Sequence, residues 1–144
     1  MKEKWAHRAD LAETAINERH ASAVWGLPRT NLAVVSWPPT TKESLFVHWH
    51  YWWQAHYLDC QVDAALRKNT KVRRTLIANT MRGIHVRNLR ALTKNRYYDD
   101  KAWMALAMAR AGELNKLRPY KKLSVLQGNI RAGIDSQVGV LPWR

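Results

Sequence analysis

Helical periodicity dominates the pattern of apolar and polar positions along the chain. Residues 3–19 place apolar side chains from Trp5 to Ile16 at helical spacing, with Glu and Arg residues on the remaining face. A second helix is predicted to begin at Lys42, with Thr41 as its N-cap. Its apolar stripe, which we expect to form the core face, consists of Leu45, Trp49, Trp52, Trp53, His56 and Cys60.

Three further helices are predicted downstream. One runs from about residue 71 to residue 92, and another follows the loop 93–98. A last one covers roughly residues 120–132. The first should pack through Val72, Leu76, Ile77, Thr80 and Ile84, and the second through Trp103, Leu106, Ala107 and Ala111. Short connections favour antiparallel hairpins. Because no strand pattern of any length occurs, the predicted fold class is all-α.

The segment from residue 20 to residue 41 interrupts this helical pattern. Pro28, Pro38 and Pro39, together with Gly26, exclude one continuous helix there. Residues 32–37 are predicted to form a short extended piece. A loop of this length inside a compact domain is usually functional, so we expect it to lie over one rim of the helical assembly.

Composition narrows the class of protein. The chain of 144 residues is predicted to be one domain, 1–144, and its hydrophobic fraction of 47% argues against disorder. The single cysteine, Cys60, cannot form an internal disulfide and is predicted to be a buried thiol. No apolar run is long enough for a membrane span, and residues 1–8 show no signal peptide. A cytoplasmic protein is the expectation.

The formal net charge of +13 makes the chain strongly basic, and basic proteins often bind nucleic acid or anionic lipid. Most of the cations in the middle of the chain crowd one segment. They are Lys68, Lys71, Arg73, Arg74, Arg82, Arg87 and Arg90, with Lys94 and Arg96 just beyond. A solvated helix face explains the same cluster, and no zinc-finger, homeodomain or RNA-recognition pattern accompanies it. Binding of nucleic acid, or docking without catalysis, is the second interpretation of this chain.

Two adjacent carboxylates, Asp99 and Asp100, open a run of good helix formers in this otherwise basic protein. An aspartate at a helix N-cap accepts a backbone N–H and suits the positive helix end. One aspartate is enough for that purpose. A pair of carboxylates beside aromatic side chains is also what a glycosidase needs, with one as nucleophile or base and the other as acid. The residues alone leave both interpretations open.

The wider motif around the pair is Tyr-Tyr-Asp-Asp-x-Ala-Trp-x-Ala-Leu-Ala-x-x-Arg-Ala, residues 97–111, and it closely resembles the signature of glycoside hydrolase family 76. Residues 5–10, 50–56 and 142–144 also resemble the family's actinobacterial members. Those enzymes are α-1,6-mannanases built on an (α/α)6 barrel. The resemblance implies hydrolysis of α-1,6-linked mannosides with retention, Asp99 being the nucleophile and Asp100 the acid/base.

The same resemblance implies a binding site for a mannan-type oligosaccharide. Its expected lining is aromatic, and its residues are Tyr97, Tyr98, Trp103, His50, Tyr51, Trp52, Trp53, Trp143 and Arg144. No organic cofactor is implied. A metal site is not expected either, because His48 and His50 are two residues apart and lie on different faces of a helix.

The number of helices falls short of the family's fold. An (α/α)6 barrel needs twelve, whereas about five are predicted here, so the chain resembles the N-terminal part of such an enzyme. An incomplete barrel has an open edge that exposes apolar stripes, which favours self-association. Half of the cleft would be missing, and the isolated chain is therefore expected to be inactive.

Overall fold

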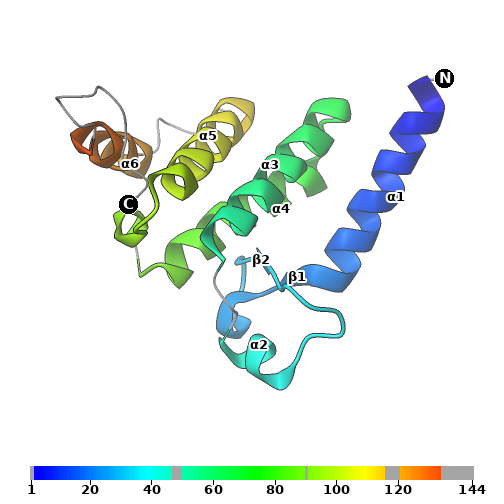
Figure 1. The fold of residues 1–144 in the computed structure, drawn as a ribbon. Helices are drawn as coiled ribbons and strands as arrows, with labels where there is room; N and C mark the ends of the chain where they lie inside the picture. The colour runs from blue at the N-terminus through cyan, green and yellow to red at the C-terminus, as the bar shows by residue number, and fades with distance from the viewer. Residues whose placement is uncertain (1, 47–49, 90, 116–120, 134–144) are drawn as a thin grey trace.

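The computed structural model describes residues 2–46, 50–89, 91–115 and 121–133 of the chain (Figure 1). This part of the chain is mostly helical, which confirms the predicted all-α class. The α-helices are α1 (Lys2–His20), α2 (Thr41–Phe46), α3 (Tyr51–Arg67), α4 (Lys71–Arg87), α5 (Tyr98–Asn115) and α6 (Lys121–Ala132). The remaining elements are the 3-10 helices η1 (Val24–Gly26) and η2 (Leu92–Lys94) and the strands β1 (Ala21–Ser22) and β2 (Leu32–Ala33).

Helix α3 lies at the centre of the assembly, where it packs against α4 and, more extensively, against α5. Figure 1 shows α3 and α4 as an antiparallel pair, as the short connection between them predicts, and α6 beside α5. Helix α1 stands apart from this group and touches α3 only lightly.

Ion pairs and hydrogen bonds attach α1 to its neighbours. Asp10 and Glu13 accept hydrogen bonds from the guanidinium of Arg73 on α4, at 2.8 and 2.6 Å, and both carboxylates also pair with Arg67 of α3. The large apolar side chains of α1 are exposed, and they are Trp5, Leu11 and Ile16. The bounds of α1 confirm the predicted helix over 3–19, but none of its described apolar residues belongs to the buried core.

The core-facing side of α3 differs from the predicted stripe. Helix α2 ends at Phe46 and α3 begins at Tyr51, with His50 as its N-cap, so the predicted continuous helix is two helices. The buried apolar face of α3 is formed by Tyr51, Ala55, Leu58, Val62 and Ala65. Trp52, Trp53 and Cys60 are exposed, and His56 is half-buried. The side chains of Leu45 and Trp49 lie outside the described part.

The physical reason for this difference is the close approach of α3 and α5. Small residues in both helices, such as Ala55, Ala65, Ala107 and Ala111, are buried between them. Indole rings in those positions would hold the two backbones apart. On α5, Trp103 and Leu106 are accordingly exposed, contrary to prediction, whereas the predicted inward positions of Ala107 and Ala111 are confirmed.

Helix α4 buries Ile77, Thr80, Met81 and Ile84, in good agreement with its predicted stripe. Of the other predicted positions, Leu76 is half-buried, and Val72 is 77% exposed in the first turn. The helix also ends at Arg87 rather than at residue 92, and Leu89 follows in the left-handed region with φ +48°.

The segment before α2 folds into a small hairpin over α3 and α4. Strands β1 and β2 pair antiparallel, with Ala21 opposite Ala33. These two-residue strands were not predicted, although β2 falls within the predicted extended piece. Behind them, the backbone of Asn31 lies directly on Gly83 of α4, where a Cβ atom would come within 2.2 Å of the Asn31 carbonyl oxygen. Only glycine fits this contact without displacing the loop.

Two expectations from composition can be compared with this structure. The predicted burial of Cys60 is wrong, because its side chain is exposed on α3. Among the described residues, none of the helices combines the length and the apolar character that a membrane crossing would need.

Candidate functional site

Asp99 and Asp100 occupy the first turn of α5, with Asp99 exposed and Asp100 half-buried. The Oδ2 atom of Asp100 accepts a hydrogen bond of 2.9 Å from the Asn95 side-chain amide. The side-chain oxygen of Asn95, Oδ1, in turn accepts a 2.8 Å hydrogen bond from the backbone N–H of Tyr97. Asn95 therefore fixes both the loop that leads into α5 and one oxygen of the second carboxylate.

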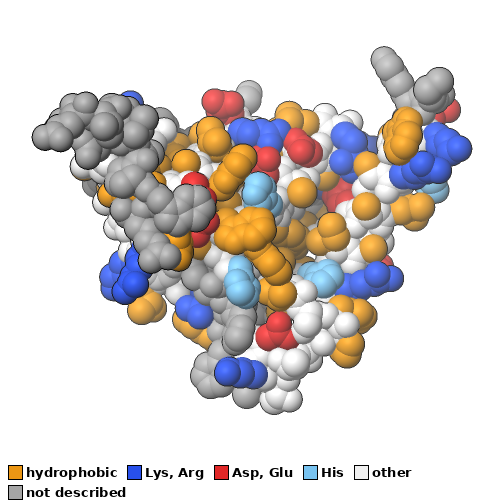
Figure 2. Space-filling model, viewed as in Figure 1, with side chains coloured by type: hydrophobic (Ala, Val, Ile, Leu, Met, Phe, Trp, Pro, Cys, Tyr) orange, Lys and Arg blue, Asp and Glu red, His pale blue; other side chains and the backbone are white. Residues whose placement is uncertain are grey.

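A continuous group of aromatic side chains extends from α5 onto α3. The ring of Trp103 lies 5.0 Å from His56, centre to centre, and His56 lies 5.6 Å from Trp52. Trp52 meets Trp53 edge-on at 5.4 Å, and Trp53 stacks on His50 at 4.9 Å. We call these five residues the aromatic surface. Figure 2 looks onto it and shows hydrophobic and histidine side chains gathered over α3.

The indole rings of this surface are accessible to a ligand. Trp103 is 49% exposed, Trp52 45% and Trp53 40%. Large apolar rings that adjoin one another on a protein surface commonly mark a binding site, and their flat faces suit the apolar faces of sugar rings. Asp99 precedes Trp103 by four residues, so the two side chains lie on the same side of α5, one turn apart. The arrangement places an exposed carboxylate at one end of a run of rings.

Two tyrosines of the predicted site lie elsewhere. Tyr51 is only 5% exposed, and its hydroxyl donates a 2.9 Å hydrogen bond to the carbonyl of Leu92. Burial, together with the negative charge of nearby Asp100, holds the pKa of Tyr51 well above its usual value. The ring of Tyr98 lies against Gly133, with the Nζ atom of Lys101 3.7 Å from its centre.

Three predicted lining residues remain, and they are Tyr97, Trp143 and Arg144. Tyr97 is half-buried in the loop that precedes α5. Trp143 and Arg144 lie outside the described residues. Of the nine predicted lining residues, His50, Trp52, Trp53 and Trp103 are thus the ones that the structure brings together on one surface.

Lys101, inside the predicted motif, was not anticipated as a special residue. Its side chain is 3% exposed, and its ammonium donates a 2.8 Å hydrogen bond to Asn129 of α6. Desolvation lowers the pKa of Lys101. The lysine connects α5 to α6 through Asn129, and it also contacts the Tyr98 ring in the first turn of its own helix.

Asn95 and His56 also belong to the site, although neither was predicted to be a site residue. Asn95 lies in the predicted loop 93–98, and His56 was predicted to be part of the core-facing stripe. The spacing of Trp52 and His56, four residues apart on one helix, was the available signal for His56. Nothing local indicated that its ring would meet Trp103 across the helix interface. Within the described ranges, no cluster of three or more His, Cys, Asp or Glu side chains has the arrangement of a metal site.

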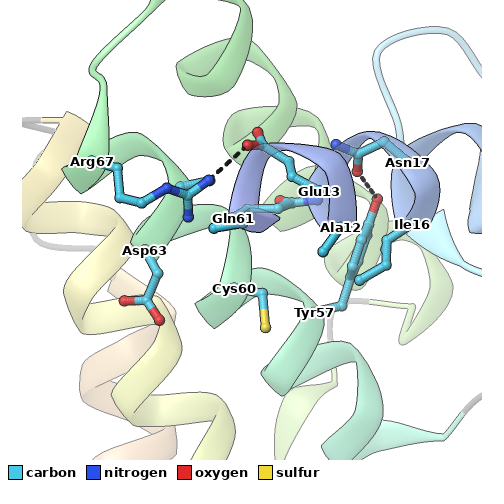
Figure 3. A pocket seen from close by; sticks show the side chains of 11 residues that line it. Ala12, Glu13, Ile16, Asn17, Tyr57, Cys60, Gln61, Asp63 and Arg67 are labelled. Carbon is cyan, nitrogen blue, oxygen red and sulfur yellow. Dashed lines mark hydrogen bonds and ion pairs between the residues drawn. The ribbon is translucent and has the colours of Figure 1, made fainter. Parts of the chain in front are cut away.

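A separate cavity of about 240 Å³ lies between α1 and α3 (Figure 3). Ala12 and Ile16 line it from α1, and Tyr57 and Gln61 line it from α3. None of the predicted catalytic or lining residues belongs to it. Tyr57 donates a 3.0 Å hydrogen bond to Asn17 and joins the two helices at this cavity.

Comparison of the chain with protein-family models, curated proteins and solved structures found no match.

Proposed function

We propose that the aromatic surface binds a glycan and that Asp99 and Asp100 are the catalytic pair of a glycoside hydrolase acting on α-1,6-linked mannosides with retention. The observation that carries the proposal is the run of exposed rings that begins one helical turn from Asp99. The resemblance of residues 97–111 to glycoside hydrolase family 76 supplies the substrate class.

In the proposed reaction, the Asp99 carboxylate attacks the anomeric carbon while Asp100 gives its proton to the leaving glycosidic oxygen. This step breaks the glycosidic bond and forms a covalent glycosyl ester on Asp99. Asp100 then accepts a proton from a water molecule, which attacks the anomeric carbon and releases Asp99. Retaining enzymes hold the two carboxyl groups about 5–5.5 Å apart.

The contacts of Asp100 support its role as acid. Asn95 binds Oδ2 of Asp100, which leaves Oδ1 as the oxygen that can carry and transfer a proton. Asp99 is the more exposed of the two carboxylates and lies on the same side of α5 as Trp103. Trp103 would stack on the sugar nearest the scissile bond, with Trp52 and Trp53 contacting the sugars beyond it.

In this proposal the α3–α4 and α5–α6 pairs are consecutive hairpins of an (α/α)6 barrel, of which residues 1–144 form the N-terminal part. The aromatic surface is then one wall of a cleft whose opposite wall belongs to the later hairpins. Glycan binding is expected of the present chain, and hydrolysis is expected of a protein with the complete barrel.

Titration of the chain with α-1,6-mannotetraose, followed by tryptophan fluorescence and calorimetry, tests the proposal. We expect saturable binding that Trp103→Ala weakens about tenfold, which corresponds to about 1.4 kcal/mol. Trp5→Ala is the matched control, because this indole is 61% exposed but lies on α1, away from the aromatic surface. Equal affinities of the two variants, or no binding by the unmodified chain, would refute the proposal.

A further inference from the structure

Helix α4 carries an unbalanced positive charge that the proposed glycan site does not use. Its 17 residues include five lysines and arginines and no acidic residue. The structure divides these cations into two groups. Arg73 faces α1 and is neutralised by Glu13 and Asp10, and Arg87 lies over the ring of Trp25 at 5.8 Å. Lys71, Arg74 and Arg82 remain.

These three cations share one exposed side of α4, which we call the basic face. Together with Thr75 and Ala78, which are also exposed, they recur at the spacing of a single helix face. The opposite side of the helix is the buried one that contains Ile77, Thr80 and Ile84. With a rise of 1.5 Å per residue, Lys71 and Arg82 are separated by about 16 Å along the helix.

No carboxylate in the described part of the chain balances the basic face. The ion pairs found there join Asp10 and Glu13 to Arg67 and Arg73, and Asp59 and Asp63 to Arg110. Arg74 donates a hydrogen bond to the neutral side chain of Asn69. The attraction of the basic face for an anionic partner is therefore not cancelled locally.

We propose that the basic face of α4 binds the phosphate backbone of double-stranded nucleic acid, without reading its sequence. A duplex carries one negative charge per about 1.7 Å of axis, so a straight array of cations can contact several phosphates at once. The guanidinium groups of Arg74 and Arg82 match the geometry of phosphate oxygens. A membrane is the less suitable partner, because an interfacial helix inserts its apolar side and that side of α4 is buried in the core.

Three phosphate contacts give a defined salt dependence. The slope of log K against log salt is expected to be about −2.7, that is, about −0.9 for each contact. Between 50 and 200 mM salt this slope weakens binding by about 40-fold. We expect the affinity of the basic face for DNA to lie in the range of non-specific binding, with Kd values of about 10⁻⁴ to 10⁻⁶ M at physiological salt.

The experiment compares two triple variants of the full chain by fluorescence anisotropy with a labelled 20-base-pair DNA duplex. The first is Lys71→Gln, Arg74→Gln, Arg82→Gln on the basic face. The second is Lys4→Gln, Arg8→Gln, Arg19→Gln, which removes the same charge from exposed positions on α1. We expect the first variant to bind about 30-fold more weakly at 50 mM salt and to lose most of the salt slope. The second should change affinity less than about threefold.

Several outcomes would overturn the proposal. Equal losses in the two variants would mean that net charge alone attracts the duplex. Binding to vesicles with 30% phosphatidylserine but not to DNA would make a membrane the partner, and a lack of DNA binding by the unmodified chain would exclude the site. All six substitutions are at exposed positions, and far-UV circular dichroism verifies that both variants are folded.

Discussion

Adding one methyl group to α4 at Gly83 would test the contact between the helix and the hairpin loop. A Cβ atom at this position would come within 2.2 Å of the Asn31 carbonyl oxygen, 2.9 Å of its carbonyl carbon and 3.0 Å of its nitrogen. All three are backbone atoms, so no side-chain rotation can relieve the clash. Either Asn31 or α4 has to move by about 1 Å to restore ordinary van der Waals contact.

Such a movement disturbs a buried hydrogen-bond network. The backbone N–H of Asn31 donates to the Asn79 carbonyl at 3.0 Å. Its side-chain amide donates to the Tyr57 hydroxyl at 3.1 Å and to the Thr80 hydroxyl at 2.8 Å. The site therefore offers little room for a compensating shift, since each bond fixes Asn31 to a different part of α3 or α4.

The expected loss of stability follows from three contributions. Overpacking of a well-packed site costs about 1–3 kcal/mol. Three neutral hydrogen bonds weakened at about 1 kcal/mol each add about 3 kcal/mol. The higher helix propensity of alanine returns about 1 kcal/mol. The net loss is about 3–5 kcal/mol, a large part of the 5–15 kcal/mol that typically separates folded from unfolded domains.

Urea denaturation followed by circular dichroism at 222 nm measures this change in the free energy of unfolding. Gly112→Ala is the matched control, because Gly112 lies inside α5 and a Cβ atom there meets nothing within 4 Å. The control should be neutral or up to about 1 kcal/mol more stable. If Gly83→Ala were as stable as Gly112→Ala, the close approach of Asn31 to α4 would be refuted.

Two further predictions concern α5. In a twelve-helix protein that carries residues 1–144, Asp99→Asn and Asp100→Asn should each lower mannooligosaccharide hydrolysis by about a thousandfold or more, with unchanged helical content; normal turnover by either would remove that residue from the mechanism. Because burial holds the pKa of Lys101 below 10.5, the unfolded chain keeps this proton to higher pH than the folded protein does. The free energy of unfolding should therefore rise as the pH increases toward 10.5, and Lys101→Met should abolish that rise; identical pH slopes in urea denaturation would contradict this account.

Most helix positions followed from the sequence because helical periodicity is a local signal, although the helix predicted from residue 42 is divided into α2 and α3. The predicted helix over residues 3–19 corresponds closely to α1, and Ile77, Thr80 and Ile84 are buried on α4 as expected. The choice of buried face on α3 did not follow. Large side chains are usually assigned to the core, yet Trp52 and Trp53 are exposed because small and medium-sized residues fill the contact with α5.

In the candidate site, too, contacts within one helix follow from the sequence, whereas contacts between helices do not. The relation of Asp99 to Trp103 is a spacing of four residues on one helix, so the sequence predicts it. The meeting of Trp103 with His56 joins two helices, and 47 residues separate them in the chain. The contact of Asn31 with Gly83 is equally non-local. From the sequence alone, a glycine inside a helix indicates only a position that destabilises the helix slightly. The folded structure is needed to identify Gly83 as a position where a larger residue would not fit.

Gln54 of α3 occupies the hydrogen-bonding groups of the small hairpin at the outer edge of β2. The Gln54 amide donates to the Ala33 carbonyl at 2.7 Å, and its carbonyl oxygen accepts from the Ala33 N–H at 3.0 Å. A carboxamide has the same donor and acceptor as a peptide group, so α3 takes the place of a third strand at this edge. An extended segment of another molecule would have to displace Gln54 before it could pair with β2 and begin edge-to-edge aggregation. Glutamate, which lacks the donor, would leave that edge half open.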